Sequence, residues 1–206
     1  MRLEIHPTHP QRRLIDIAVA ALRKDGVIIY PTDSCYAFGC ALSSPDAAAR
    51  IRAIRQMGKQ QFLTLVCRDL SELAAFARVD NSSYRLIKSL TPGPYTFILQ
   101  ATRELPRRLF DPKRKTIGLR IPDHPVTQAL LEALDSPLLS ATAEDGSDGE
   151  PLSDPEEIVE RLGRRVDVFL DAGAGGLEPT TVLNLVGDEP ELVRRGAGEI
   201  DHLLGR

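Results

Sequence analysis

The sequence predicts an α/β fold built around a mixed sheet. Short apolar stretches of strand length alternate with amphipathic stretches of helix length over most of the 206 residues, and this alternation is typical of strand–helix–strand units. The last third also contains closely spaced strand candidates, which favour some antiparallel pairing. No internal repeat and no long linker divides the chain, so we expect a single domain over residues 1–206.

Helical periodicity and capping signals define the helices. Apolar residues recur at helical spacing before Gly26, a residue suited to end a helix. Several proline residues directly follow a polar residue that can begin a helix. The expected helices are Arg12–Lys24, one beginning at Ser44-Pro45, a short one capped by Asp69 with Glu72 three residues later, Val126–Leu134, and one beginning at Asp154-Pro155.

The strands are short β-rich runs bounded by turn residues. The segment Thr91-Pro92-Gly93-Pro94 cannot be regular structure and opens one of them, whereas Ala143–Ser153 is small, acidic and typical of a surface loop. The expected strands are Val27–Tyr30, Leu63–Cys67, Tyr95–Ala101, Thr116–Ile121, Ser136–Ala141, Val166–Leu170, Thr181–Leu185 and Glu191–Arg195.

The composition is typical of a soluble globular protein. Hydrophobic residues make up 42% and charged residues 27% of the chain, so it can bury a core without disulfides or metals. No apolar run approaches the roughly 20 residues that span a bilayer, and Met1–Pro10 lacks the apolar core of a secretory signal. We therefore expect a cytoplasmic protein without a membrane partner.

Two weaker patterns favour ordinary structure over chemistry. Four residues separate Cys35 from Cys40, but the four histidines supply no second ligand pair, so we expect buried free thiols and no metal site. Nothing in the sequence selects a Cys–His nucleophile pair. The run Gly173–Gly176 is more often a plain turn than a phosphate cradle, and the two common glycine-rich nucleotide-binding loops are absent from the sequence.

Charge is unevenly distributed along the chain, although the formal net charge is only −3. The segment Arg103–Arg120 contains seven basic and two acidic residues, whereas Glu144–Glu160 contains eight acidic residues and no basic one. The basic segment could meet phosphate and the acidic one would repel it. The alternative is that both are solvated surface segments.

The stretch Tyr30–Cys40 carries the functional argument. A strand runs into Pro31, which ends pairing, and then into the polar residues Thr32, Asp33 and Ser34. Ligands of α/β sheets bind in the crevice at the carboxyl ends of strands, so we expect these side chains to point into that crevice. The alternative is a turn in which they only cap the next segment.

This stretch resembles the YrdC-like (Sua/YciO/YrdC) family, in which a YPT(D/E) turn is followed by Gly-Cys. Further segments match family motifs in family order, and these are Thr91–Thr96, Ile117–Pro125, Ser140–Ala143, Pro179–Val182 and Val193–Gly196. Within the family the chain is most similar to the YciO branch, and the segments that indicate this are His6–Gln11, Phe62–Leu70, Pro106–Leu109 and Lys113–Gly118.

The resemblance implies a twisted open α/β sandwich with a mixed parallel/antiparallel sheet and a basic concave cavity. It implies binding of double-stranded RNA or tRNA. It also implies a nucleotidyltransferase of the threonylcarbamoyladenylate synthase kind, which makes threonylcarbamoyl-AMP and pyrophosphate from L-threonine, bicarbonate and ATP with Mg²⁺, for the threonylcarbamoyladenosine modification of tRNA. The alternative is a non-catalytic or weakly catalytic double-stranded RNA-binding protein.

The resemblance assigns the site residues through the matched motifs. Displacement at phosphorus needs side chains that position the reactants and neutralise charge. The threonine site would use Thr32, Arg120, Thr180 and Thr181. The nucleotide site would use Arg55, Lys59, Ser140, Thr142 and Arg194. RNA would bind to one basic face, to which Arg120 would also contribute. The RNA-binding residues of this face would be Arg107, Arg108, Lys113, Arg114 and Lys115.

Two departures from the family pattern weaken the nucleotide half of this site. The family's K-x-R segment corresponds to Arg55-Gln56-Met57, so Met57 replaces a cation for which Lys59 is the nearest substitute. The family's asparagine after S-T-S-A is Glu144 here, and a carboxylate beside a triphosphate is repulsive. We therefore expect synthase activity that is slow, altered or absent.

Overall fold

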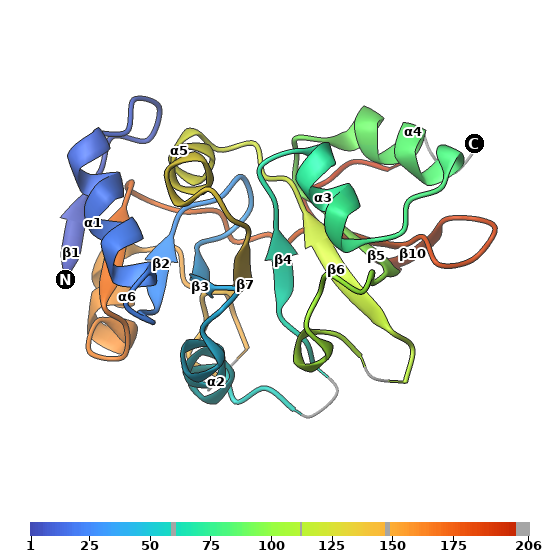
Figure 1. The fold of residues 1–206 in the computed structure, drawn as a ribbon. Coiled ribbons are helices and arrows are strands. Elements are labelled where there is room, and N and C mark those ends of the chain that lie inside the picture. Colours follow the sequence, from blue (N-terminus) through green and yellow to red (C-terminus); the bar gives the residue numbers. More distant parts are fainter. Residues whose placement is uncertain (59–60, 112, 147–148, 201–206) are drawn as a thin grey trace.

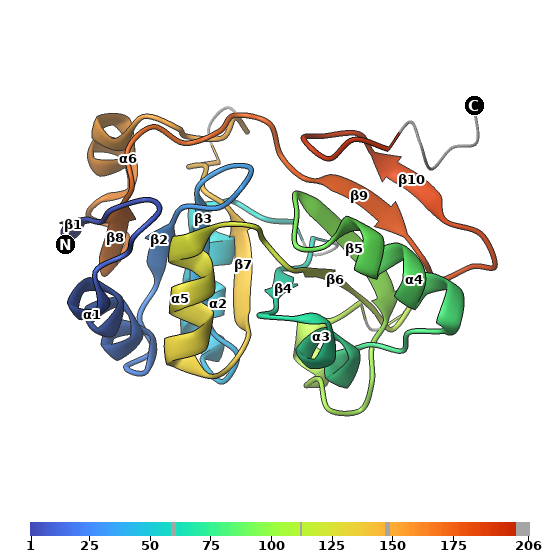
Figure 2. The same cartoon turned by 90° about the horizontal axis from the view of Figure 1, so that it is seen from above.

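The computed structural model describes residues 1–58, 61–111, 113–146 and 149–200, in which ten strands form one mixed sheet (Figures 1 and 2). The order across the sheet is β1-β8-β2-β3-β7-β4-β6-β5-β9-β10, with β2 parallel to β8 and antiparallel to β3. The strands are β1 (Arg2–Glu4), β2 (Ile28–Tyr30), β3 (Ala37–Ala41), β4 (Thr64–Val66), β5 (Tyr95–Gln100), β6 (Thr116–Arg120), β7 (Leu138–Thr142), β8 (Val168–Asp171), β9 (Thr181–Asn184) and β10 (Glu191–Arg194). This confirms the predicted mixed α/β fold.

Helices pack on both faces of the sheet in the described part of the chain. They are α1 (Arg12–Leu22), α2 (Pro45–Ile54), α3 (Leu70–Phe76), α4 (Asn81–Leu90), α5 (Pro125–Leu134) and α6 (Pro155–Leu162), with one 3₁₀ turn, η1 (Arg107–Leu109). Figure 1 shows α5 above the strands and α2 below them. The sheet is therefore the middle layer of three.

Two hydrophobic cores lie on these faces. In the smaller one α1 and α5 pack against β2, β7 and β8, through residues such as Leu22, Leu130 and Val168. The larger one collects α2, α3, α4 and α6, and Ile51 and Leu73 are fully buried in it. The apolar spacing seen in the sequence therefore identifies the inward faces of these helices.

Most helix starts use the expected capping chemistry. The Asp69 carboxylate accepts a hydrogen bond from Glu72 N at 2.8 Å, and Asp154 accepts from two backbone N–H groups of α6. Ser44 precedes α2 as predicted, but its hydroxyl donates to the Asp25 carboxylate and does not cap the helix. This contact joins the start of α2 to the turn after α1.

The structure adds three elements that the sequence pattern does not predict. β1 is a three-residue edge strand. α4 begins with the polar run Asn81-Ser82-Ser83, and the Asp80 carboxylate accepts hydrogen bonds from the N–H groups of Ser82 and Ser83. β3 forms a hairpin with β2 inside the stretch expected to be a turn. A Cβ at Gly39 would lie 2.9 Å from the Tyr30 ring, so this glycine lets the ring lie flat on β3.

Candidate functional site

A cavity of about 450 Å³ lies over the middle of the sheet. Its floor consists of alternate residues on five neighbouring strands, and these are Ser140 (β7), Thr64 (β4), Gly118 and Arg120 (β6), Thr96 (β5) and Val182 (β9). The intervening residues Leu65, Leu119 and Phe97 pack in the larger core on the other face. Strand alternation thus puts a polar floor and an apolar core on opposite sides of the same strands.

The turn after β2 lies beside the cavity and supports both interpretations of its polar residues. Thr32 Oγ1 donates to Cys35 O at 2.6 Å and accepts from Ser34 N at 3.2 Å, so it stabilises the turn itself. The same oxygen accepts from Arg120 Nη2 at 3.3 Å. Ser34 and Cys35 line the cavity directly. Thr32 therefore holds this wall of the cavity and contacts Arg120.

Arg120 is a buried charge at the end of β6, only 8% exposed. One of its Nη atoms forms an ion pair with Asp33, whose other carboxylate oxygen accepts from Asp123 N at 2.8 Å. Its Nε is buried and has no hydrogen-bond partner among the described residues. Arg120 was also expected to contribute to a basic face flanking the cavity, and the structure places it in the cavity lining itself, where it is buried.

Ser140 lines the cavity and belongs to a buried hydrogen-bond chain. Its hydroxyl donates to Phe38 O at 2.8 Å and lies 2.8 Å from the Tyr30 hydroxyl. Desolvation raises the pKa of Tyr30 to about 12, so the neutral phenol donates to Ser140. One acceptor site of Ser140 is left for another donor.

Thr180, which directly precedes β9, and Thr181, its first residue, point in different directions. Thr180 lines the cavity, and its hydroxyl lies 2.9 Å from that of Thr96. Arg194 on β10 also lines the cavity and donates to Thr180 O at 2.9 Å. Thr181, expected in the threonine site, does not reach the cavity, because its side chain points to the opposite face and its hydroxyl donates to Gly198 O at 2.6 Å.

Arg55, at the end of α2, is the second largely buried arginine of the cavity. It forms an ion pair with Glu144, and its Nε is buried without a partner in the described part of the chain. Desolvation and the charge of Arg194 lower the pKa of Arg55 to about 10, so it remains a cation at neutral pH. Met57 and Thr142 line the cavity too.

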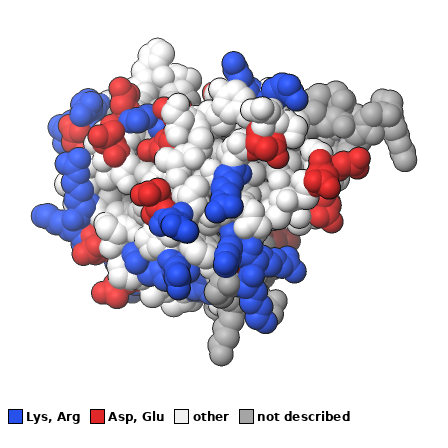
Figure 3. Space-filling model, turned by 45° about the vertical axis from the view of Figure 1, so that its right-hand side comes forward, with Lys and Arg blue, Asp and Glu red and all other residues white. Residues whose placement is uncertain are grey.

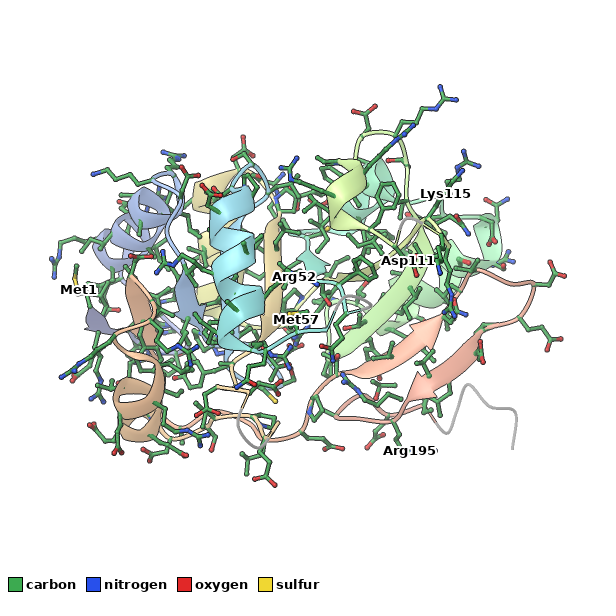
Figure 4. All side chains as sticks on the ribbon, turned by 90° about the horizontal axis from the view of Figure 1, so that it is seen from below. Met1, Arg52, Met57, Asp111, Lys115 and Arg195 are labelled. Atoms are coloured by element: carbon green, nitrogen blue, oxygen red, sulfur yellow. The ribbon has the colours of Figure 1, made fainter. Side chains whose placement is uncertain are left out.

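Lys59 was expected to assist Arg55, and it lies outside the described residues. The chain on either side of it is tied to α2, because Arg52 donates to Gln61 O at 2.6 Å and to Gly58 O at 3.0 Å. Figure 4 shows Arg52 on α2 and Met57 beyond its end, with Asp111 and Lys115 near the start of β6.

The other basic residues lie between β5 and β6. Their side chains are exposed, and they are Arg107, Arg108, Lys113, Arg114 and Lys115. Arg114 also lines the cavity, and Asp111 accepts hydrogen bonds from the N–H groups of Lys113 and Arg114. Figure 3 shows Lys and Arg side chains gathered in the lower middle of one face of the molecule.

Sequence reasoning missed the residues that support the turn. A Cβ at Gly176 would lie 1.8 Å from Ser34 O, and one at Gly175 would lie 2.6 Å from the Tyr36 ring. The Tyr36 hydroxyl donates to Gly173 O at 2.6 Å. The glycine run is therefore a packing surface for the wall of the cavity, and the adjacent glycines were the signal.

The cysteines and the lengths of the helices also bear on the predictions made from the sequence. Cys35, Cys40 and Cys67 are free and buried as expected, and burial raises the pKa of the Cys35 thiol despite the nearby charges of Arg120 and Arg194. Within the described ranges, no helix has both the length and the apolar character needed to cross a membrane.

The fold and the site define an α/β protein with an arginine-lined ligand cavity, and comparison with known proteins gives its family. The Sua5/YciO/YrdC family model, whose description is "Telomere recombination", matches residues 20–196. The chain is 51% identical over 200 residues to the uncharacterized protein YciO of Escherichia coli, covering 97% of each chain. The chain therefore belongs to the Sua5/YciO/YrdC family, and the resemblance to the YciO branch is confirmed.

Solved structures agree with this assignment. The crystal structure of E. coli YciO matches with a TM-score of 0.94 and 50% identity, over 98% of each chain. The crystal structure of P. abyssi Sua5 complexed with L-threonine shares the fold with a TM-score of 0.90 at 21% identity, over 98% of this chain and 59% of that one. The threonylcarbamoyl-AMP synthase of Halorhodospira halophila is 33% identical over 165 residues, covering 80% of this chain and 85% of that protein.

Proposed function

We propose that the protein binds L-threonine and ATP in this cavity and makes threonylcarbamoyl-AMP. One observation carries the proposal: Arg120 and Arg55 both line the cavity, and each has a buried Nε–H without a hydrogen-bond partner among the described residues. A buried charged donor left unpaired is costly. Two such donors in one cavity are best explained by a ligand with anionic groups.

Threonine fits the surroundings of Arg120. Its carboxylate would accept from the free guanidinium N–H groups, because a guanidinium pairs with a carboxylate through parallel hydrogen bonds. The hydroxyls of Thr180, Thr96 and Ser34 line the same cavity and would surround the polar part of the amino acid. The name of the Halorhodospira relative supports this choice of substrate.

The nucleotide fits the other arginines. Arg55, Arg194 and Arg114 line the cavity and would neutralise phosphate oxygens. In the reaction the threonine nitrogen bonds to the carbon of bicarbonate with loss of water, giving a carbamate. A carbamate oxygen then bonds to the α-phosphorus as the bond to the β-phosphate oxygen breaks, and pyrophosphate leaves. The protein contributes positioning and charge neutralisation.

The test is incubation of the protein with L-threonine, bicarbonate and ATP with Mg²⁺, followed by measurement of pyrophosphate and of the adenylate. We expect pyrophosphate release that requires both threonine and bicarbonate and that falls in Arg120→Lys. The control is Arg12→Lys, because that side chain is 75% exposed. Release that does not depend on threonine would contradict the proposal.

A second function is favoured by the exposed cations of residues 107–115. We propose that this segment, with the basic area visible in Figure 3, contacts the phosphates of double-stranded RNA. Phosphate contacts release counterions, so the affinity should fall steeply as salt rises. We expect Lys113→Gln with Lys115→Gln to weaken binding of a short RNA duplex and to flatten its salt dependence, and Lys24→Gln to do neither. A flat salt response of the wild type would contradict this second function.

A further inference from the structure

The charges around the cavity nearly cancel. Among the described residues, the charged side chains that line it are Arg55, Arg114, Arg120, Arg194 and Asp111. Two of the arginines are already paired with carboxylates outside the lining, Arg120 with Asp33 and Arg55 with Glu144. Four guanidinium groups thus face three carboxylates. The cavity has a small positive charge, although arginines dominate its lining.

Glu144 is a fixed part of this balance. Its side chain is 13% exposed, and the residue after it, Asp145, pairs with Arg161 of α6 at 2.6 Å. Gly146 adopts a φ of +79°, and a Cβ there would lie 3.0 Å from the backbone of Arg55. The segment that follows β7 is therefore packed onto the end of α2. Its geometry holds the Glu144 carboxylate against Arg55.

We infer that Glu144 sets the charge that the cavity accepts, and that the cavity prefers a nucleoside monophosphate or its acyl ester over a free nucleoside triphosphate. The inference rests on the proposed function, because it takes a nucleotide as the ligand. AMP carries about two negative charges at pH 7.5 and ATP about four. A ligand whose charge exceeds that of the cavity leaves unneutralised charge in a site of low dielectric, where this is most costly.

The same argument determines how ATP enters. One divalent cation bound to the triphosphate lowers its charge to about that of AMP. Wild-type protein should therefore bind ATP much better with Mg²⁺ than without it. Removal of the Glu144 charge should make ATP binding less dependent on Mg²⁺, because Arg55 would then neutralise one more phosphate charge.

The experiment is calorimetric titration of the full chain with AMP, ADP and ATP at pH 7.5, first in EDTA and then with Mg²⁺. In EDTA we expect the wild type to bind AMP at least as tightly as ATP. In Glu144→Gln we expect the affinity for ATP to rise at least about tenfold relative to that for AMP, because one partly buried charge has an effect of this size. Glu160→Gln removes an equal charge from an exposed position on α6 and should leave the wild-type order unchanged.

Two results would overturn the inference. One is wild-type protein that binds ATP in EDTA more than tenfold more tightly than AMP. The other is a folded Glu144→Gln variant whose ratio of ATP to AMP affinity equals that of the wild type. If this variant does not fold, the wild-type series with and without Mg²⁺ decides alone. If ATP binds more tightly than AMP in EDTA, the inference fails but the proposed function stands. If AMP binds at least as tightly as ATP but the protein makes no threonylcarbamoyl-AMP, only the proposed function is contradicted.

Discussion

Two arginine–carboxylate pairs border the cavity, and they differ in what surrounds them. The first, Arg120 with Asp33, joins the last residue of a central strand to the turn after β2, and Asp33 is held further by Asp123 N. The second, Arg55 with Glu144, joins the end of a helix to the residues after β7. The first pair is therefore anchored at the end of a sheet strand, whereas the second lies between the loop after α2 and the loop after β7.

This difference indicates two roles for one interaction. Asp33 is a positioning residue, because it fixes a cavity-lining guanidinium whose Nε has no hydrogen-bond partner among the described residues. Glu144 limits the positive charge available to a ligand at Arg55. The role of an ion pair near a binding site therefore depends on which groups hold its carboxylate and on which guanidinium N–H groups have no hydrogen-bond partner.

The largest expected effect is on stability in Arg120→Ala. The change leaves the Asp33 side chain, which is 10% exposed, without its cation. Breaking a buried pair from one side costs about 3–5 kcal/mol, so the free energy of unfolding measured in urea should fall by about that amount. Arg12→Ala, at an exposed position, should change it by less than about 0.5 kcal/mol. Equal stability of the two variants would show that Arg120 is not structurally paired.

Arg55→Gln should have a smaller effect on the same measurement. Glu144 would lose its partner, but the Arg55 side chain is 19% exposed against 9% for Arg120, so this pair is less buried and we expect a loss of about 2 kcal/mol. The double variant Arg55→Gln with Glu144→Gln removes both charges and should recover at least half of that loss. A double variant that is less stable than Arg55→Gln would contradict the contrast between the two pairs.

Tyr30→Phe tests the hydrogen-bond chain in the floor between β2 and β7. The change removes the donor to Ser140, which keeps its own bond to Phe38 O. One neutral hydrogen bond contributes about 1 kcal/mol, so the free energy of unfolding should fall by about that much, whereas threonine affinity should be unchanged. A loss of threonine affinity would place Ser140 in the amino acid site.

The smallest effect concerns pH near the Arg120 pair. Burial lowers the pKa of His124, against the charges of Asp33 and Asp123, and its neutral ring accepts a hydrogen bond from Val126 N at the start of α5. The unfolded chain therefore takes up a proton more readily than the folded one, and stability is lost as the pH falls below about 6.5. His124→Asn keeps a capping oxygen and should lose less stability between pH 7.5 and pH 5.5. An identical pH dependence in both proteins would assign the loss to other groups.

The sequence predicts most of the fold because hydrophobic periodicity and capping residues are local signals. It misses β3, since small residues such as Gly39 carry little strand preference while the packing of Tyr30 on them requires a strand. It also misses α4, where the polar start Asn81-Ser82-Ser83 hides the apolar residues that follow.

Individual site residues are harder to predict than the fold. The YPT turn leads to Thr32 and the Ile117–Pro125 motif leads to Arg120, and the structure places their Oγ1 and Nη2 atoms 3.3 Å apart. Thr180 and Thr181 are adjacent in sequence, yet only Thr180 lines the cavity, because successive residues of an extended chain point to opposite faces. Likewise, Glu144 could be recognised as unfavourable from sequence, but its pairing with Arg55 depends on long-range packing.

The role of Arg120 in threonine binding is tested by calorimetric titration of L-threonine into wild type, Arg120→Lys and Arg12→Lys. Lysine keeps the charge of Arg120 but cannot form parallel hydrogen bonds with a carboxylate. We expect Arg120→Lys to bind threonine at least about tenfold more weakly than the wild type, and the exposed Arg12→Lys to bind it equally well. Identical threonine affinity in all three proteins would show that Arg120 is only structural and that the threonine site lies elsewhere.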